Sequence, residues 1–313
     1  MAGPLVLYAG DAAEWPVYRA ALNDALEARG VKARLVNRTE APEKVDYIVY
    51  APSSGLSDFT PFTRLKAVLS LWAGVEKIQN NPTLQVPLAR MVDPGMSAGM
   101  AEYVLGHVMR HHLGMDADIL NRTGPWRNRP APPLARDRPV GILGLGALGS
   151  AAARRLSAQG FPVSGWSRTQ KNLPGIACHS GVDGLQNVLG RAQILVLLLP
   201  LTHETENILN AETLTMLPRG AVVINPGRGP LIDDDALLDS LDSGKLSHAT
   251  LDVFRTEPLP DDHPFWAHPR VTVTPHIASE TRPQTAAETI AENIRRGEAG
   301  EPFLHLVNRQ LGY

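Results

Sequence analysis

Short apolar runs alternate along the chain with stretches that have an amphipathic helical pattern. Runs such as 139–143 and 194–199 are mostly apolar, which is typical of strands buried on both faces of a parallel sheet. The stretch 15–29 instead repeats its apolar residues at helical spacing, as a helix with one buried face does. This alternation predicts an α/β fold in which helices cover parallel sheets.

The alternation occurs in two groups, and a length of 313 residues also suggests about two domains. The second group contains roughly six predicted strands, the number in a complete dinucleotide-binding sheet. We therefore predict two Rossmann-like domains. The substrate domain would comprise 1–98 and 278–313, and the dinucleotide-binding domain, 99–277, would be inserted into it.

Turn-forming and polar residues mark the connections around the second domain. Asp93-Pro94-Gly95 predicts a turn where the chain enters it, before a long helix that begins at Ser97 or Ala98. The polar stretch 116–137, rich in proline and arginine, predicts an irregular arm. Cys178 lies in a polar, loop-like stretch, and we assign it no role.

The glycines after the run 139–143 carry the clearest chemical signal. Gly144, Gly146 and Gly149 have the spacing G-x-G-x-x-G. In a dinucleotide-binding turn, the first glycine allows a tight turn, the second lets a pyrophosphate approach, and the third lets helix and strand pack closely. The helix N-terminus would then bind the phosphates. An ordinary turn could hold the same glycines, but a second strand predicted at 161–166 favours a nucleotide site.

The end of that second strand indicates which dinucleotide would bind. NAD sites usually place Asp or Glu there, to accept hydrogen bonds from the ribose. This chain has Ser167 and Arg168, with Lys171 close behind. A hydroxyl and a guanidinium would bind the 2′-phosphate of NADP, which a carboxylate would repel. We therefore predict NADPH as the preferred cofactor and NADH as a weaker alternative. In the opposing interpretation, Arg168 is a solvated arginine that stacks on adenine.

Polar residues follow three further strands of the second domain. Arg228 lies in N-P-G-R-G-P, Glu257 in L-D-V-F-R-T-E-P and His276 in T-P-H-I-A-S. Because parallel strands end at one edge of a sheet, we expect these side chains to meet beside a nicotinamide. Arg228 would bind the carboxylate of a 2-keto acid and polarise its carbonyl group. His276 would supply the proton, and Glu257 would hold the imidazolium in place. Singly, each such residue is more often structural.

A loop of mostly small residues follows a predicted strand of the first domain. Its residues Trp72, Ala73, Gly74 and Val75 could present backbone N–H groups to an anion. A plain tight connection would have the same composition. We predict these residues as the substrate-binding loop.

Joined in this order, the motifs resemble the D-isomer-specific 2-hydroxyacid dehydrogenases, and among them the reductases of glyoxylate and hydroxypyruvate. The resemblance covers nearly the whole chain, through S-L-W-A-G-V-E, M-A-E-Y, V-G-I-L-G-L-G-A-L-G, G-W-S-R, L-L-P-L-T, N-P-G-R-G, L-D-V-F-R-T-E-P-L-P, T-P-H-I-A and L-G-Y. It implies that Arg228, Glu257 and His276 are catalytic and that the backbone of 73–75 holds the substrate carboxylate. It also implies a homodimer, with the helix and arm after Met100 at the interface. Cofactor contacts are implied at Ala147, Leu148, Ser167, Arg168, Leu199, Pro200, Pro226, Gly227, Asp252 and Ser279.

Trp72 stands where many relatives have a small residue. It would narrow the pocket and favour glyoxylate and hydroxypyruvate over bulky acids, unless it merely packs between the domains. The predicted function is therefore NADPH-dependent reduction of these small 2-keto acids to glycolate and D-glycerate. Two alternatives stay open: reduction of a larger acid, such as phenylpyruvate or a branched 2-keto acid, and a non-catalytic dinucleotide sensor similar to corepressors.

Composition argues against several other classes of protein. The net charge of −2 does not suggest a nucleic-acid partner, and no apolar run approaches the roughly 20 residues that span a bilayer. Cys178 is the one cysteine, which excludes an internal disulfide framework and predicts a cytoplasmic protein. His107, His111 and His112 have helical spacing but no H-E-x-x-H arrangement, so we predict packed or solvated histidines and no metal site.

Overall fold

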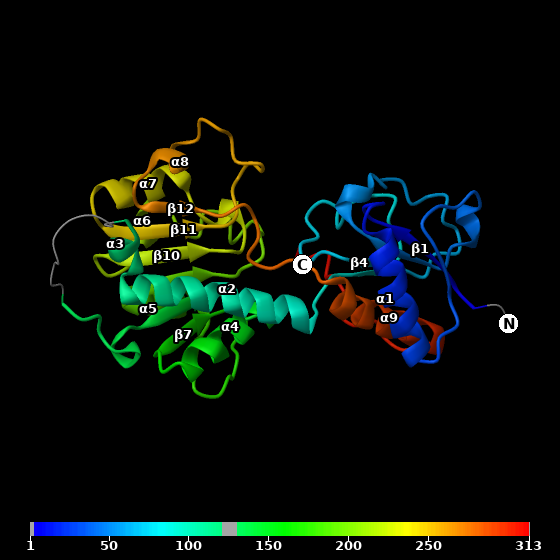
Figure 1. The fold of residues 1–313 in the computed structure, drawn as a ribbon, viewed down its shortest axis with the longest axis horizontal. Coiled ribbons are helices and arrows are strands. Elements are labelled where there is room, and N and C mark those ends of the chain that lie inside the picture. The colour runs from blue at the N-terminus through cyan, green and yellow to red at the C-terminus, as the bar shows by residue number, and fades with distance from the viewer. Residues whose placement is uncertain (1–2, 121–129, 313) are drawn as a thin grey trace. The chain divides into compact units, whose positions relative to one another are not determined.

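The computed structural model describes residues 3–120 and 130–312, and the chain divides into two compact units. Unit 1 comprises Met1–Met96 with Thr281–Tyr313, and unit 2 comprises Ser97–Glu280. The boundaries predicted from the sequence differ from these by a few residues. Each unit has a parallel sheet with helices packed on it (Figure 1), which confirms the predicted fold class.

Within the described residues, the sheet of unit 1 has five strands in the order β2-β1-β3-β4-β5, and all neighbours are parallel. The strands are β1 (Leu5–Ala9), β2 (Arg34–Val36), β3 (Tyr47–Tyr50), β4 (Ala67–Ser70) and β5 (Leu88–Ala89). This order is that of the flavodoxin-like doubly wound sheet. Strands β3 and β4 are buried at every position, because the sheet is covered on both faces.

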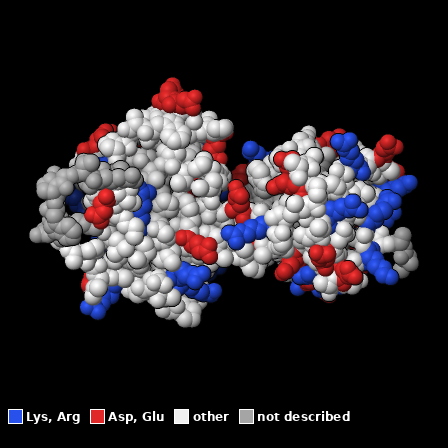
Figure 2. Space-filling model, in the orientation of Figure 1, with Lys and Arg blue, Asp and Glu red and all other residues white. Residues whose placement is uncertain are grey.

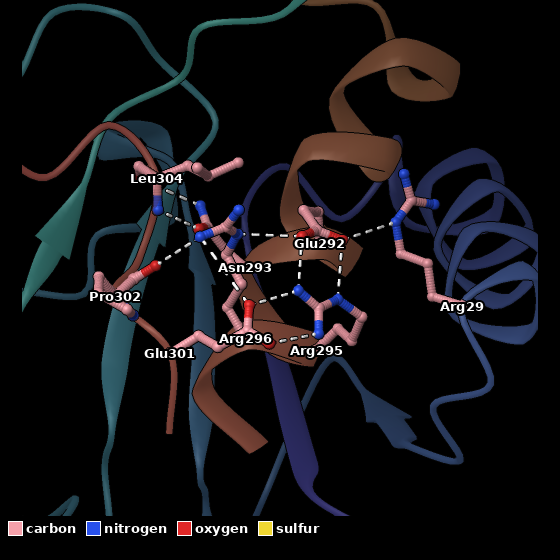
Figure 3. Close-up of polar contacts among 8 residues, drawn as sticks. All are labelled: Arg29, Glu292, Asn293, Arg295, Arg296, Glu301, Pro302 and Leu304. Atoms are coloured by element: carbon pink, nitrogen blue, oxygen red, sulfur yellow. Dashed lines mark hydrogen bonds and ion pairs between the residues drawn. The ribbon is translucent and has the colours of Figure 1, made fainter. Parts of the chain in front are cut away.

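The first and last parts of the chain both belong to unit 1, where helices α1 and α9 lie side by side (Figure 1). The described helices of this unit are α1 (Trp15–Ala28), α9 (Pro283–Ala299) and the 3₁₀ turns η1 (Pro42–Lys44) and η2 (Pro52–Ser54). In Figure 3, the carboxylate of Glu292 accepts hydrogen bonds from Arg295 and Arg296. Its Oε2 also lies 3.6 Å from Nε of Arg29, the residue that directly follows α1. The ion pair between Glu292 and Arg29 connects α9 to the end of α1, whereas the other two pairs lie within α9.

Within the described residues, the sheet of unit 2 has seven parallel strands in the order β12-β11-β10-β9-β6-β7-β8. The strands are β6 (Val140–Leu143), β7 (Val163–Trp166), β8 (Ala177–His179), β9 (Ile194–Leu197), β10 (Ala221–Asn225), β11 (Leu246–Leu251) and β12 (Val271–Val273). This is the strand order of a dinucleotide-binding sheet with one further strand at its edge. The order reverses between β6 and β9, so a ligand is expected beyond the carboxyl ends of these two strands.

Helices cover both faces of the second sheet. The described helices are α2 (Pro94–Leu113), α3 (Met115–Leu120), α4 (Ala147–Ala158), α5 (Gly181–Arg191), α6 (Ala211–Met216), α7 (Asp234–Asp242), α8 (Pro264–Ala267) and the 3₁₀ turns η3 (Ala135–Asp137) and η4 (Gly229–Leu231). Ile194 and Val196 pack in one core with α2 and α4, whereas Leu195 and Leu197 pack in another with α5, α6 and α7. The alternation along β9 follows the two-residue period of a strand.

The start of α2 was predicted wrongly. The helix begins at Pro94, inside the stretch expected to be a turn. The carboxylate of Asp93 accepts a hydrogen bond from the backbone N–H of Met96 at 3.0 Å, as an N-cap residue does. Proline at the first helical position is also favourable, because its missing N–H would have no intrahelical acceptor there.

Three further local predictions were wrong. Cys178 lies in the edge strand β8 rather than in a loop, and the sheet therefore has more than the six strands expected. This strand is short and partly exposed, so no apolar run in the sequence predicts it. Residues 115–120 form α3 instead of an irregular arm, and the part of that arm at 121–129 lies outside the described residues.

The predicted histidines pack within unit 2. His112 is 5% exposed, and His111 Nε2 lies 2.9 Å from the hydroxyl of Thr250. The described residues contain no group of His, Cys, Asp and Glu suited to a metal ion. None of the described helices is both long and apolar enough to cross a membrane. On the face shown in Figure 2, basic and acidic side chains are interspersed.

Candidate active site

The turn between β6 and α4 has the geometry that its glycines predict. Gly144 adopts a φ of +107°, and a Cβ there would lie 2.5 Å from the backbone of Leu198. A Cβ on Gly149 would lie 1.7 Å from the carbonyl oxygen of Gly144. Both positions therefore require glycine, the first for its conformation and for the close approach of the backbone directly after β9, the second for helix packing.

Gly146 differs from the other two glycines because the space around it is open. It is exposed, and a Cβ there would meet no atom within 4 Å. Gly146 is the N-cap of α4, where no side chain caps the helix and the first turn has no acidic residue. Free helical N–H groups and the positive end of the helix dipole therefore adjoin open space. These residues fit the pyrophosphate of a dinucleotide, with Ala147 exposed and Leu148 half-buried in the first turn.

The chain after β9 runs beside this turn, where the strand order reverses. The N–H of Leu198 donates to the carbonyl of Leu143 at 2.7 Å. The side chain of Leu199 is buried, and the carbonyl of Pro200 accepts a hydrogen bond from the Thr205 hydroxyl at 2.7 Å. The predicted cofactor residues Leu199 and Pro200 are thus held in a fixed segment next to the glycine turn.

The end of β7 carries the residues predicted to choose the cofactor. Ser167 is 8% exposed, and its hydroxyl donates to the carbonyl of Thr169 at 2.8 Å. Its N–H donates to the carbonyl of His179 in β8 at 3.1 Å. Arg168 is exposed. Because the hydroxyl of Ser167 donates within its own loop, Arg168 is the better placed donor for a phosphate.

An amide side chain fixes the backbone around Arg228. Asn225, which is 1% exposed at the end of β10, donates from Nδ2 to the carbonyl of Arg228 at 2.9 Å. Its Oδ1 accepts from the N–H of Gly227 at 3.1 Å. A Cβ on Gly229 would lie 2.0 Å from the backbone of Phe254, so this loop packs tightly on the segment after β11. The predicted residues Pro226 and Gly227 are buried, and Arg228 is half-buried.

Glu257 and His276 are in direct contact. Oε2 of Glu257 lies 2.8 Å from Nδ1 of His276, and the two side chains are 36% and 54% exposed. Oε1 of the same carboxylate accepts a hydrogen bond from the N–H of Phe254 at 2.9 Å. The carboxylate thereby orients the imidazole, and Nε2 is the ring nitrogen left to exchange a proton with a ligand.

His276 has an unusual backbone conformation, which Asp252 supports. Its φ is +54°, in the left-handed region that costs a residue other than glycine roughly 1 kcal/mol or more. Asp252 is fully buried, and its carboxylate accepts hydrogen bonds from the N–H groups of Ile277 and Ala278, both at 2.9 Å. These bonds fix the chain directly after His276. Asp252, predicted as a cofactor residue, thus has a structural role in this loop.

The predicted substrate loop belongs to unit 1 and is described within that unit. Trp72 is 43% exposed, whereas Val75 is 3% exposed in the core. The N–H groups of Ala73, Gly74 and Val75 donate to no acceptor among the described residues. The carbonyl of Leu71 accepts a hydrogen bond from the hydroxyl of Thr281 at 2.6 Å. The loop therefore presents consecutive donors that could bind a carboxylate.

The three residues predicted to be catalytic all follow strands at the same edge of the sheet. Arg228 follows β10, Glu257 follows β11 and His276 follows β12, and these three strands are neighbours. Ser279 is half-buried shortly after His276.

The role of Asn225 was missed, although a polar residue that ends the apolar run A-V-V-I-N was a usable signal. Tyr103 was missed because its hydrogen bond comes from a distant helix.

A sheet of this strand order, an open glycine turn and a paired histidine at its carboxyl edge define a dinucleotide-dependent oxidoreductase. The family model described as D-isomer specific 2-hydroxyacid dehydrogenase, NAD binding domain, matches residues 103–278. The chain therefore belongs to the family of D-isomer-specific 2-hydroxyacid dehydrogenases, which confirms the resemblance seen in its motifs.

Known proteins from three bacteria illustrate the similarity. Glyoxylate/hydroxypyruvate reductase A of Serratia proteamaculans is 44% identical over 259 residues, which cover 80% of this chain and 82% of the relative. A D-isomer specific 2-hydroxyacid dehydrogenase from Xanthobacter autotrophicus Py2, solved with NADPH and MES, matches with a TM-score of 0.90 and 43% identity over 100% of both chains. An NADPH-dependent glyoxylate/hydroxypyruvate reductase from Sinorhizobium meliloti, solved with NADP and sulfate, matches with a TM-score of 0.85 and 35% identity, covering 99% of this chain and 100% of that chain.

Proposed function

We propose that this protein reduces small 2-keto acids, glyoxylate and hydroxypyruvate, to the corresponding 2-hydroxy acids with NADPH. The observation that carries the proposal is the 2.8 Å contact between Glu257 and His276 at the carboxyl edge of a dinucleotide-binding sheet. Relatives named glyoxylate/hydroxypyruvate reductase A, at 42–44% identity, support the choice of substrate.

The nicotinamide, when bound, supplies a hydride to the carbonyl carbon of the substrate. Arg228 binds the substrate carboxylate and polarises the carbonyl group, because its planar fork of donors matches that geometry. His276 gives a proton to the carbonyl oxygen as negative charge grows there. Glu257 keeps the imidazole oriented through the contact of its carboxylate with Nδ1. The N–H groups of 73–75 provide further donors for the substrate carboxylate.

Two observations support NADPH over NADH. The residues directly after β7 are Ser167 and Arg168, with no carboxylate to repel a 2′-phosphate. The related structures from Xanthobacter autotrophicus Py2 and Sinorhizobium meliloti hold NADPH and NADP. Gly144, Gly146, Gly149 and the start of α4 would bind the pyrophosphate.

A homodimer and a cytoplasmic location belong to the same proposal. Large apolar side chains are exposed on and after α3: Met115 is 38% exposed, Ile119 51% and Leu134 57%. Exposed apolar side chains are the kind that a protein interface covers, and these three follow Met100 in the sequence, in the region where the family resemblance places the interface. Sedimentation equilibrium measures the oligomeric state directly, and a monomer at micromolar concentration would contradict the dimer.

A panel of substrates tests the proposed activity. NADPH absorbance is followed with glyoxylate, hydroxypyruvate, phenylpyruvate and a branched 2-keto acid, and kcat/KM is compared across the panel. We expect the two small acids to give the largest values. Preference for phenylpyruvate would assign a larger substrate. Tight NADPH binding without turnover of any acid would instead identify a dinucleotide sensor.

A further inference from the structure

A chain of hydrogen bonds connects helix α2 to the loop that carries His276. The hydroxyl of Tyr103 lies 2.7 Å from Oγ1 of Thr274, and that hydroxyl donates to Oδ1 of Asp252 at 2.5 Å. Asp252 in turn accepts hydrogen bonds from the N–H groups of Ile277 and Ala278. Thr274 precedes His276 and the two N–H groups follow it, so the chain of hydrogen bonds holds the loop on both sides.

The direction of each hydrogen bond follows from the groups present. The hydroxyl of Thr274 donates to Oδ1 of Asp252, the oxygen that also accepts from the N–H of Ile277. That hydroxyl has a single proton, and Tyr103 must therefore be the donor in its bond to Thr274. Burial raises the pKa of Tyr103, which keeps this donor protonated across the neutral and mildly alkaline range.

The conformation of His276 needs such support. Its side chain is 54% exposed, so packing of the imidazole does little to fix the loop. Its left-handed φ of +54° persists only where the surrounding structure determines it. The anchor for that conformation is Asp252, which is fully buried directly after β11.

We propose that Tyr103 is a positioning residue, whose hydroxyl fixes the His276 loop through Thr274 and Asp252. The proposal rests on the proposed function in giving His276 the role of proton donor. Tyr103 acts at a distance: it orients the hydroxyl of Thr274 toward Asp252, and Asp252 then holds the two N–H groups beyond His276. A tyrosine hydroxyl on a helix thereby contributes to the geometry of proton transfer.

Replacement of Tyr103 by phenylalanine tests this proposal, because it removes one oxygen and keeps the ring. The ring centroids of Tyr103 and His107 lie 4.5 Å apart, and this contact would stay. We expect kcat to fall about five-fold, equivalent to about 1 kcal/mol for one neutral hydrogen bond. The KM for NADPH should stay unchanged. Hydrogen exchange at the amides of Ile277 and Ala278 should become faster by a similar factor, since their acceptor is less well fixed.

Tyr47→Phe is the matched control. The hydroxyl of Tyr47 donates to Glu298 at 2.8 Å within unit 1, and the residue is fully buried. This variant loses a comparable hydrogen bond and should keep the wild-type kcat and the wild-type exchange rates at 277 and 278. Adding Tyr103→Phe to Thr274→Val should cause no further loss, because the valine has already removed the acceptor.

Wild-type kcat together with wild-type exchange at 277 and 278 in Tyr103→Phe would overturn the proposal. An equal loss of kcat in Tyr47→Phe would overturn it as well, since the effect would then be one of general stability. If the wild-type protein reduces no 2-keto acid, the proposed function fails. The exchange rates at 277 and 278 still decide whether Tyr103 fixes the loop.

Discussion

Each unit has a strand that turns directly into a helix, and the two turns differ in what they leave open. In unit 2 the turn from β6 to α4 contains Gly146, exposed and uncrowded at an uncapped helix start. In unit 1 the turn from β1 to α1 contains Asp11 and Glu14. The two units share a fold class, but only the turn in unit 2 suits a phosphate.

The turn in unit 1 is closed by its own residues. The carboxylate of Asp11 accepts a hydrogen bond from the N–H of Ala13 at 2.9 Å, and Pro16 removes one N–H from the first turn of α1. A Cβ on Gly10 would lie 2.6 Å from the hydroxyl of Tyr8, so this glycine adjoins a side chain instead of open space. Negative charge at this position repels a pyrophosphate. Dinucleotide binding is therefore a property of the turn and not of the fold.

The largest expected effect comes from removing the imidazole of His276, at the sheet edge of unit 2. His276→Gln should lower kcat by roughly 10²- to 10⁴-fold, the usual contribution of a positioned proton donor. NADPH affinity, measured by fluorescence titration, should stay within about two-fold, because the glycine turn is intact. His268→Gln is the matched control, since His268 also pairs with a carboxylate, Asp242, at 3.2 Å. Near-normal turnover in His276→Gln would exclude this residue as the proton donor.

The second prediction makes the open turn resemble the closed one. Gly146→Asp should weaken NADPH binding roughly 100-fold, because a carboxylate at the helix start repels the pyrophosphate. The protein should fold with equal or greater stability, since a Cβ at this position meets no atom and Asp is a favourable N-cap.

Gly190→Asp is the control for this change, because Gly190 is exposed in α5 and also has open space for a Cβ. Isothermal titration calorimetry with NADPH and thermal melting separate the two effects. Undiminished affinity in Gly146→Asp would remove the basis of the comparison between the two turns.

The third prediction concerns the cofactor that the open turn accepts. Arg168→Ala should reduce kcat/KM for NADPH by about 10-fold or more, the size of a hydrogen bond between charged groups. Turnover with NADH should change little, because that cofactor has no 2′-phosphate. Arg191→Ala removes another exposed arginine from the same unit and should affect neither cofactor. An equal loss with both cofactors would assign Arg168 to stacking on adenine.

The fourth prediction tests what the loop of unit 1 contributes to the choice of substrate. Trp72→Ala should raise kcat/KM for phenylpyruvate relative to glyoxylate by roughly 10-fold, because it removes a large apolar side chain. Trp266→Ala is the control, since Trp266 is similarly exposed, at 52%, in unit 2. An unchanged ratio in Trp72→Ala would contradict a role in selecting substrate size.

The sequence predicted those parts of the molecule whose signal is local. The glycine spacing predicted the turn because each glycine there meets a local requirement, such as the approach of Gly149 to Gly144. Helix α5 was missed because Gly181, Gly184 and Gly190 lower its helix propensity, and packing of its buried residues stabilises it instead. Strand β8 was missed because a short edge strand needs no apolar run.

In the candidate site, too, the residues with a local signal were predicted and those that depend on tertiary contacts were missed. Glu257 and His276 were predicted as partners because each follows a strand at the same sheet edge. The contact of Tyr103 with Thr274 joins residues 171 positions apart, and no spacing in the sequence encodes it. The left-handed conformation of His276 is likewise a tertiary property, since nothing in T-P-H-I-A requires it.

The last prediction distinguishes the two units by their response to acid. Burial lowers the pKa of His111 to about 3 and that of His248 to about 4. Both stay neutral in the folded protein while the unfolded chain takes up protons below about pH 6.5. The free energy of unfolding should therefore fall as pH drops from about 6.5 to 4, by at most about 1.4 kcal/mol per histidine per pH unit.

His111→Gln keeps a group that can reach the Thr250 hydroxyl and removes one of these titrations, so urea unfolding should show a shallower loss of stability between pH 6.5 and 5. Glu292→Gln is the contrasting variant in unit 1. Hydrogen bonds from Arg295 lower the pKa of Glu292 to about 2, so its contribution disappears only as pH falls from about 4.5 toward 2. It should leave the slope between pH 6.5 and 5 unchanged. A wild-type slope in His111→Gln would show that this histidine is protonated in the folded protein, contrary to its burial in unit 2.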